Sequence, residues 1–320
     1  MSYPENLFQT YSIVARDANT GELGVAVQTH QMCVGAVVPW LAVGQGALAT
    51  QSLTNVRFGP MGLAMLKAGI PAEQVVAGLI ATDEERDKRQ LAVVDRHGHA
   101  SAWTGENCIA FAGHRTGEGY SVQANMMYRK TVIGAMAEAF EEAQGDLAAR
   151  MLTALEAAQR EGGDIRGMQS AALKVVGGAE IAEETDRLIP RYDLRVDEHV
   201  DPVAELGRLV RLRRAQLRSG EGFELLKRGK TGAALETWRE ARELAPELEE
   251  LAFWQAMALA DEGDDIPGAV DLLGTILRDD PLREQWLDLI ERIQDCGIIE
   301  REGVAKALMP ALQTAWEGGM

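Results

Sequence analysis

The chain changes character at Asp201-Pro202, and this change constrains the fold more than any other feature of the sequence. Before this point, short segments rich in β-branched residues alternate with turn residues and with segments of helical periodicity. After it, the strand pattern is absent and the periodicity is helical. A chain of 320 residues is long enough for two hydrophobic cores. We therefore predict an extension at residues 1–9, an α+β domain at 10–205 and an all-α domain at 206–320.

The predicted α+β domain alternates between groups of strands and groups of helices. Helical periodicity occupies residues 60–67, 72–80, 131–143 and 147–160, and Asp146 is placed to cap the last of these helices. Segments with a strand pattern lie at residues 11–16, 23–28, 36–43, 46–51, 90–95, 100–104, 108–112, 120–124, 170–176 and 191–196. This order suits a four-layer arrangement, with two stacked sheets and helices outside them. An α+β sandwich with one sheet fits the periodicity as well, so the pattern alone leaves both open.

The helical domain contains an internal similarity at a spacing of 35 residues. The corresponding positions are Ala234 and Ala269, Trp238 and Leu273, and Pro246 and Pro281. The pattern resembles helix pairs of the tetratricopeptide type. Such pairs cannot bury their apolar faces alone, so we expect the tail to stack on the first domain or on a protein partner.

The charge of the chain restricts its partners. It contains 32 basic and 49 acidic residues, which give a formal net charge of -17. Phosphate backbones are repelled by such a surface, so we expect no nucleic-acid partner. No apolar segment has the length and lack of charge that a membrane span requires, and residues 1–9 lack the apolar core of a signal peptide. The sequence therefore predicts a cytoplasmic protein that does not bind membranes.

The sequence contains none of the familiar signatures of a metal or cofactor site. Cys33, Cys108 and Cys296 form no CxxC pair and have no zinc-ligand spacing. Gly44-Gln45-Gly46 does not open a helix, so the dinucleotide-binding pattern is missing, as is a phosphate-binding GKS/T loop. We therefore predict no metal and no cofactor.

Polar residues lie beside glycines and at the ends of the predicted strands. Amides at such positions orient a polar ligand or stabilise an oxyanion, and they equally satisfy backbone groups at buried strand ends. His114 is a candidate general base or ligand donor, with a hydrogen bond to loop backbone as the alternative. Asp164 and Arg166 lie just past the end of a predicted helix, where they either pair with each other or bind the carboxylate of a ligand through a forked contact. The candidate binding residues are Gln51, Asn55, Gln123, Asn125, Asp164, Arg166 and Gln169.

Six stretches of the predicted α+β domain resemble a known family when they are read in order. They are TYSIVARDANTGELGVAVQT (10–29), VVPWLAVGQGALATQSLTNVRFGP (37–60), TGENCIAFAGH (104–114), SVQANM (121–126), GGDIRGMQSAAL (162–173) and YDLRVDEH (192–199). The family is the bacterial domain-of-unknown-function family 1028, which belongs to the N-terminal-nucleophile hydrolase fold group. The resemblance implies a four-layer αββα sandwich, in agreement with the order of strands and helices.

The resemblance also implies where a nucleophile would lie. In this fold group a Thr, Ser or Cys at the start of the first strand attacks the substrate, and its own α-amino group acts as the base. By position this residue is Thr10, and Ser12, on the same face of the strand, is the second candidate. Because nine residues precede Thr10, the mechanism requires cleavage of the bond between Gln9 and Thr10.

Two functional hypotheses follow. In the first, the domain hydrolyses an amide-type C–N bond of a small polar molecule, with Thr10 or Ser12 as nucleophile and His114 assisting proton transfer. In the second, the domain binds a small molecule without turnover, and its helical tail binds a protein partner. A homodimer formed through the sheet edges or the tail is a further expectation.

Overall fold

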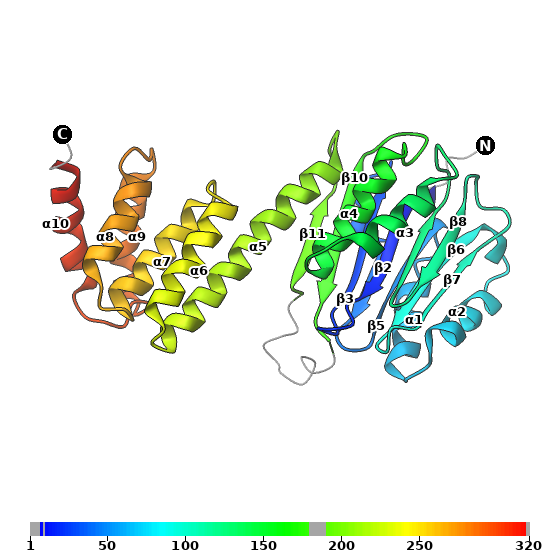
Figure 1. Ribbon diagram of the computed structural model, residues 1–320, viewed down its shortest axis with the longest axis horizontal. Coiled ribbons are helices and arrows are strands. Elements are labelled where there is room, and N and C mark those ends of the chain that lie inside the picture. The colour runs from blue at the N-terminus through cyan, green and yellow to red at the C-terminus, as the bar shows by residue number, and fades with distance from the viewer. Residues whose placement is uncertain (1–6, 9, 179–189, 318–320) are drawn as a thin grey trace. The chain divides into compact units, whose positions relative to one another are not determined.

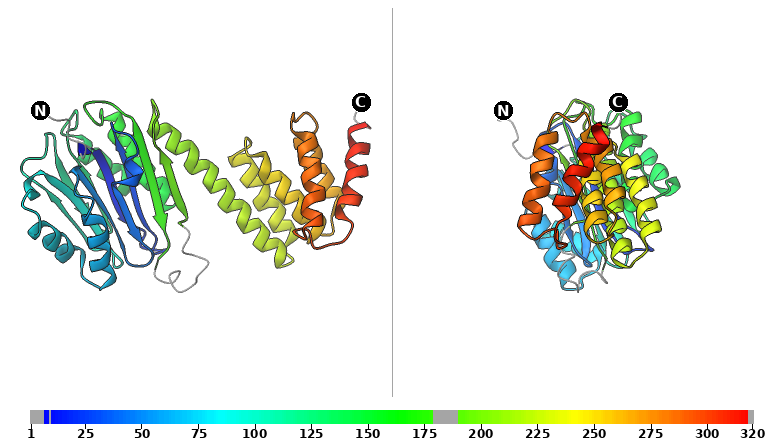
Figure 2. Two further views of the ribbon diagram at one scale, coloured as in Figure 1. Left: turned by 180° about the vertical axis from the view of Figure 1, so that it is seen from behind. Right: turned by 90° about the vertical axis from the view of Figure 1, so that its left-hand side faces the viewer.

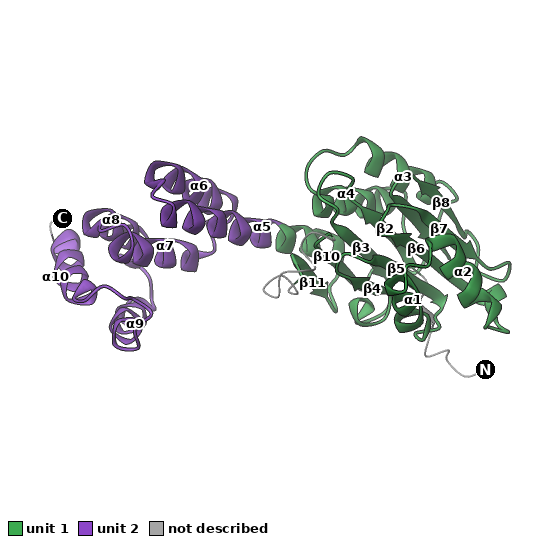
Figure 3. Ribbon diagram, turned by 90° about the horizontal axis from the view of Figure 1, so that it is seen from below, with its two compact units in different colours: residues 1–210 green, residues 211–320 purple. Residues whose placement is uncertain are grey.

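The computed structural model describes residues 7, 8, 10–178 and 190–317 and divides into two compact units. Unit 1 comprises residues 1–210 and unit 2 comprises residues 211–320 (Figure 3). The division falls within helix α5 (Pro202–Lys227). Of the predicted extension at residues 1–9, only Leu7 and Phe8 are described, as the short strand β1 paired with β5.

Unit 1 contains two antiparallel sheets. The first has the order β1-β5-β6-β7, with β4 also paired to β5. Its strands are β1 (Leu7–Phe8), β4 (Pro39–Ala42), β5 (Gly46–Leu53), β6 (Arg89–Asp95) and β7 (Ala100–Thr104). The second sheet has the order β11-β10-β3-β2-β9-β8, with β2 and β3 at its centre (Figure 2). Its strands are β2 (Thr10–Arg16), β3 (Leu23–Thr29), β8 (Gly113–Gly117), β9 (Tyr120–Ala124), β10 (Ser170–Val176) and β11 (Tyr192–Val196).

The sheets face each other, and helices cover their outer faces (Figure 1). Helices α1 (Phe58–Lys67) and α2 (Ala72–Ala81) pack on the first sheet, whereas α3 (Val132–Glu142) and α4 (Leu147–Arg160) pack on the second. An apolar core that includes Val14, Val27, Ala47 and Ala92 fills the space between the sheets. Because both faces of each sheet are covered, the central strands are buried along nearly their whole length.

Strand β2 shows how this packing sorts side chains. Successive side chains of a strand point to opposite faces. Tyr11 points to the helix side, where its hydroxyl donates a hydrogen bond to Gln159 of α4. Ser12 points to the other side and reaches Gln51 of the facing sheet. Thr10 and Ser12 therefore lie on the side of β2 that faces the first sheet.

Two predicted strands differ from the structure. Residues 36–43 were expected to be extended, but a 3-10 turn at Val34–Ala36 shortens the strand to Pro39–Ala42. Residues 108–112 form a loop, and β8 begins only at Gly113. This loop is held in place because the Ile109 and Phe111 carbonyls accept the backbone N–H groups of residues 126 and 127. The apolar residues at 108–112 therefore predicted a strand, whereas this segment is a loop that backbone hydrogen bonds to residues 126 and 127 hold in place.

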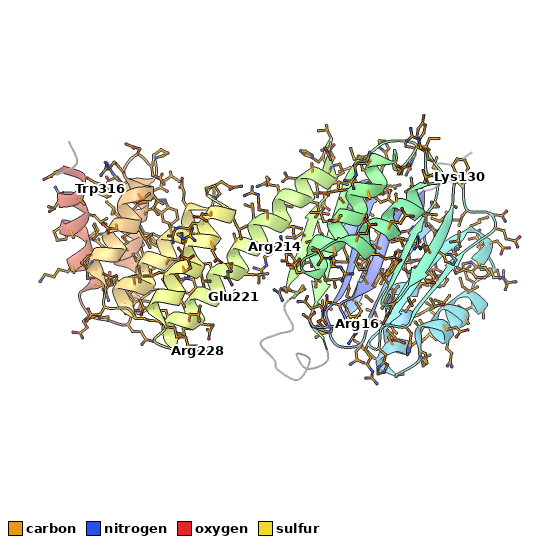
Figure 4. All side chains as sticks on the ribbon, in the orientation of Figure 1. Arg16, Lys130, Arg214, Glu221, Arg228 and Trp316 are labelled. Carbon is orange, nitrogen blue, oxygen red and sulfur yellow. The ribbon has the colours of Figure 1, made fainter. Side chains whose placement is uncertain are left out.

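The helices of unit 2 pack around their own apolar core. They are α5 (Pro202–Lys227), α6 (Thr231–Leu244), α7 (Glu249–Asp261), α8 (Ile266–Leu277), α9 (Arg283–Asp295) and α10 (Val304–Glu317). Figure 4 labels Glu221 on α5, Arg228 directly after the end of that helix, and Trp316 on α10. The core includes Trp238, Phe253, Leu273, Ile290 and Leu308. The described part of this unit is helical, as the sequence predicts. Throughout the described residues, no helix has both the length and the apolar character needed to cross a membrane.

Candidate functional site

The space between the two sheets holds a group of polar side chains at one end of the apolar core. Strands β2, β5, β6 and β9 contribute Ser12, Gln51, Gln90 and Gln123. All four residues have an exposed fraction of 0%. Burying so many polar groups is tolerable only when they bond to one another, because an unpaired polar group in a dry interior is costly.

Ser12 occupies the centre of this group. Its hydroxyl donates to Gln51 Oε1 at 2.7 Å and accepts from Gln123 Nε2 at 2.6 Å. Gln123 is fixed in turn, since its Oε1 accepts a hydrogen bond from Ser121 at 2.9 Å. The hydrogen of the Ser12 hydroxyl is therefore directed to an amide oxygen, which is not a general base.

From Ser12 the hydrogen bonds lead to the surface. Gln51 Nε2 donates to Gln90 Oε1 at 2.7 Å, and Gln90 Nε2 donates to Thr104 Oγ1 at 2.9 Å. Thr104 Oγ1 lies 2.8 Å from His114 Nδ1. His114 is exposed, and partial desolvation lowers the pKa of its imidazole. A neutral histidine at neutral pH thus ends the chain of bonds that starts at Ser12.

Thr10, the first residue of β2, is the exception in this network. Its carbonyl accepts hydrogen bonds from the Asn125 backbone N–H at 3.1 Å and from Gln51 Nε2 at 3.3 Å. Its side-chain hydroxyl is buried and has no hydrogen-bond partner among the described residues. Asn125 Oδ1 is likewise buried and unpartnered, although Asn125 Nδ2 donates to Gln90 Oε1 at 2.8 Å. Thr10 at the start of β2 and Asn125 after the end of β9, which are joined through their backbones, therefore each carry a buried polar atom without a partner among the described residues.

Asn55 is not part of this network. Its Nδ2 donates to Asp83 Oδ2 at 2.9 Å, and Asp83 forms an ion pair with Arg89 at 2.9 Å. Burial opposes ionisation of Asp83, but hydrogen bonds from Arg89 and Asn55 dominate and lower the pKa of its carboxyl. Arg89 also donates to the Leu53 carbonyl at 2.7 Å. In the structure Asn55 therefore helps to fix the end of β5.

Asp164 and Arg166 bond to each other near the opposite face of β2. Arg166 Nη2 lies 2.7 Å and its Nε 3.0 Å from the two carboxylate oxygens of Asp164. Burial and then the charge of Asp164 raise the pKa of Tyr11, which points to the helix side of the strand. Of the two alternatives that the sequence left open for Asp164 and Arg166, the structure shows pairing with each other. Gln169 is held nearby through its backbone, which donates to Thr29 and accepts from His199.

Three residues that complete the network were not among those predicted from the sequence, namely Gln90, Thr104 and Ser121. Gln90 joins Gln51, Asn125 and Thr104, and it also donates to the carbonyls of Gly113 and Ala124. One signal was available, since Gln90 opens a predicted strand and Thr104 ends the next one. Within the described residues, no group of three or more His, Cys, Asp or Glu side chains could hold a metal ion.

Comparison with known proteins places this chain in a family. The model of a family of unknown function, DUF1028, matches residues 10–206, and the chain belongs to this family. A similar solved structure is the crystal structure of protein SPO2555 from Silicibacter pomeroyi, which is assigned to DUF1028 as well. The two chains are 32% identical with a TM-score of 0.57, over 63% of this chain and 88% of that chain. Curated proteins gave no match. The family resemblance inferred from the sequence is therefore confirmed.

Proposed function

We propose that unit 1 is an αββα sandwich of the N-terminal-nucleophile type, that the uncut chain is its precursor, and that the mature form hydrolyses an amide-type C–N bond of a small polar molecule. The order of layers supports this fold assignment, because two facing sheets are each covered by two helices. The antiparallel central strands β2 and β3 bring the start of β2 beside the polar network.

The unpartnered hydroxyl of Thr10 is the observation that carries the proposal. Leaving a buried hydroxyl unsatisfied costs about 1–3 kcal/mol, so its retention calls for an explanation. A nucleophile explains it, because its oxygen must stay available to a substrate. Ser12 is a weaker candidate, because its hydroxyl already bonds to two glutamines and no base contacts it.

The chemistry would begin with cleavage of the bond between Gln9 and Thr10. The released α-amine, with a pKa of about 8, takes the proton of the Thr10 hydroxyl while the oxygen attacks the substrate carbonyl. The amine then passes this proton to the leaving nitrogen as the C–N bond breaks. Water hydrolyses the resulting ester and restores Thr10. Gln51 and Asn125 would orient the substrate and stabilise the oxyanion, and their existing hydrogen bonds to the Thr10 carbonyl support this role.

The other candidate site residues have supporting roles in this proposal. Gln123 holds Ser12 and thereby the inner wall of the site. His114 exchanges protons with solvent at the outer end of the network. Asn55, Asp164, Arg166 and Gln169 would contact the substrate only if cleavage rearranges the loops that carry them, since each is engaged elsewhere.

A second function is favoured by a different observation. Thr10 and Ser12 are both fully buried, so neither hydroxyl is open to a substrate in the uncut chain. If no cleavage takes place, unit 1 is a small-molecule-binding module without turnover. Unit 2 would then supply the interaction with a protein partner. Its helix α6 carries Ala234 and Trp238, and α8 carries the corresponding Ala269 and Leu273, which supports tetratricopeptide-like pairing.

Intact mass and turnover together separate these functions. We expect purified wild-type protein to lose residues 1–9 and to hydrolyse at least one member of a panel of amides and ureido compounds. Thr10→Ala should keep its full mass and lose turnover, whereas Ser12→Ala and His114→Ala should still be cleaved and turn over more slowly. A full-length mass, with ligand binding and no product, would support the binding module. Unchanged turnover in all three variants would exclude the assigned residues.

A further inference from the structure

Unit 2 contains a cavity of about 490 Å³ between α5, α7 and the connection from α9 to α10. Its apolar lining includes Phe223 of α5, Trp254 and Met257 of α7, and Ile298 of the connection. A volume of this size lies within the range of about 300–1,000 Å³ that is typical of ligand-binding sites. It is large enough to take one or two bulky side chains.

The apolar lining is held in place and remains open to solvent. Trp254 Nε1 donates to Glu250 Oε1 at 3.0 Å, and its ring packs edge-on against Phe253 with 5.3 Å between the centroids. Ile298 is 59% exposed, although Ile299 beside it is buried. Asp261 accepts the backbone N–H groups of residues 300 and 301 and so fixes the connection that carries Ile298. A fixed apolar surface left exposed is typical of an interaction site.

The charge around this cavity indicates the chemistry of its occupant. Glu250, Asp261 and Glu262 line it, and none of the described lining residues is Lys or Arg. Arginines close to these elements are already paired, Arg218 with Glu221 and Glu240, and Arg301 with Asp264. An acidic rim that contributes no basic side chain of its own, around an apolar floor, complements a ligand that carries positive charge beside an apolar group.

We propose that this cavity binds a segment of a partner protein in which a large aliphatic or aromatic side chain is flanked by arginine or lysine. The apolar side chain enters between Phe223, Trp254 and Met257. The flanking cation bonds to Glu262 at the rim, and an arginine there also stacks on the indole of Trp254. The inference rests on the proposed role of unit 2 in binding a protein, and it is independent of hydrolysis by unit 1.

The experiment measures binding of fluorescein-labelled peptides to the full-length chain by anisotropy. The probe is Gly-Ser-Gly-Arg-Leu-Leu-Arg-Gly-Ser-Gly, and the comparison peptides replace both arginines by glutamate or both leucines by alanine. We expect the probe to bind and both comparison peptides to bind at least about tenfold more weakly, because each loses one of the two complementary features. Added salt should weaken probe binding by screening the rim charges.

Variants then locate the binding site. Glu262→Lys should weaken binding of the probe by about tenfold or more, and Ile298→Asp should do the same from the apolar side. Both residues are exposed, so their replacement should leave the helices folded, which circular dichroism checks. Glu291→Lys, an exposed charge reversal on α9 outside the cavity lining, should bind as the wild type does.

Three results would overturn the proposal. The first is absence of probe binding by folded wild-type protein. The second is equal binding of the glutamate peptide, and the third is unchanged binding by both Glu262→Lys and Ile298→Asp. A concentration-dependent dimer that Ile298→Asp abolishes would assign the cavity to a second copy of the chain instead. Hydrolysis measured on the same preparations reports on unit 1 alone, so failure of one proposal is distinguishable from failure of the other.

Discussion

Two hydroxyl side chains on the same face of β2 differ in their hydrogen bonding. Ser12 uses its hydroxyl as donor and acceptor within the buried network. Thr10, two residues earlier, leaves its hydroxyl without a partner among the described residues, although it is equally buried. Buried hydroxyls normally find partners, so the difference separates a side chain that is bonded within the fold from one that is not, and the proposed function accounts for the second as a nucleophile.

This difference predicts opposite effects on stability. Ser12→Ala leaves Gln51 Oε1 and Gln123 Nε2 without their partner and should lower the free energy of unfolding by about 2–4 kcal/mol. Thr10→Val keeps the β-branched shape and removes only the unpartnered hydroxyl, so the free energy of unfolding should stay the same or rise.

Urea titrations provide the measurement, with Ser12→Ala introduced into the Thr10→Val background, where the proposed cleavage is blocked and both chains retain residues 1–9. Thr10→Val itself is compared with the wild-type fraction that intact mass shows to be uncut, because loss of the preceding residues would itself change the unfolding free energy. A loss of more than about 1 kcal/mol in Thr10→Val would show that this hydroxyl has a partner after all.

At the level of single elements, the sequence predicted best where the signal is local. Helix α4 (Leu147–Arg160) and strand β10 (Ser170–Val176) have the predicted bounds. For α4 the reason is local, because Asp146 caps the helix by accepting the Ala149 N–H at 2.9 Å. The prediction of a strand at residues 108–112 was wrong. The conformation of this loop depends on backbone hydrogen bonds to residues 126 and 127, and the residue pattern of the loop itself does not indicate them.

The sequence indicated which polar residues to consider for the candidate site, but not which of them bond to one another. The residues selected at strand ends or beside glycines include Gln51, Gln123 and Asn125, which the structure joins with Gln90 and Ser12 in one network. They also include Asn55 and Asp164, whose partners Asp83 and Arg166 lie outside the network. Strand-end position identifies a polar side chain, but which partner it meets depends on contacts between distant segments.

Helix α1 makes a prediction at this scale through Gly59. A Cβ atom at this position would overlap the indole of Trp40, whose Nε1 is held by the Val37 carbonyl. Gly59→Ala should therefore lower the free energy of unfolding by about 1–3 kcal/mol, although alanine favours helices. Gly134, in the first turn of α3, has no atom within 4 Å of such a Cβ.

Gly134→Ala serves as the matched control in thermal or urea unfolding. Alanine lowers the backbone entropy of the unfolded chain and meets no clash here, so the free energy of unfolding should rise by about 0.5 kcal/mol. Equal changes in the two variants would mean that close packing against Trp40 does not determine the residue at position 59.

At the scale of the whole molecule, three apolar clusters each draw on residues of one unit. The core of unit 2 comprises residues between 226 and 312, including Trp238 and Leu273. The clusters of unit 1 comprise residues between 14 and 176, including Val27 and Leu79. Separate cores of this kind are the physical basis for separate cooperative unfolding.

We therefore expect calorimetry of the full-length chain to resolve two transitions that respond to different substitutions. Trp238→Ala removes a fully buried indole that bonds to the Ser219 carbonyl and packs against Phe223, at a cost of about 3–5 kcal/mol. In a unit of this size the loss should lower one midpoint by about 10 °C or more and leave the other in place. Leu79→Ala, in the core beneath α2, should lower the second midpoint only. If Trp238→Ala moved both midpoints together, the two cores would unfold as one cooperative unit, and binding at the tail would then be coupled to the stability of the polar network in unit 1.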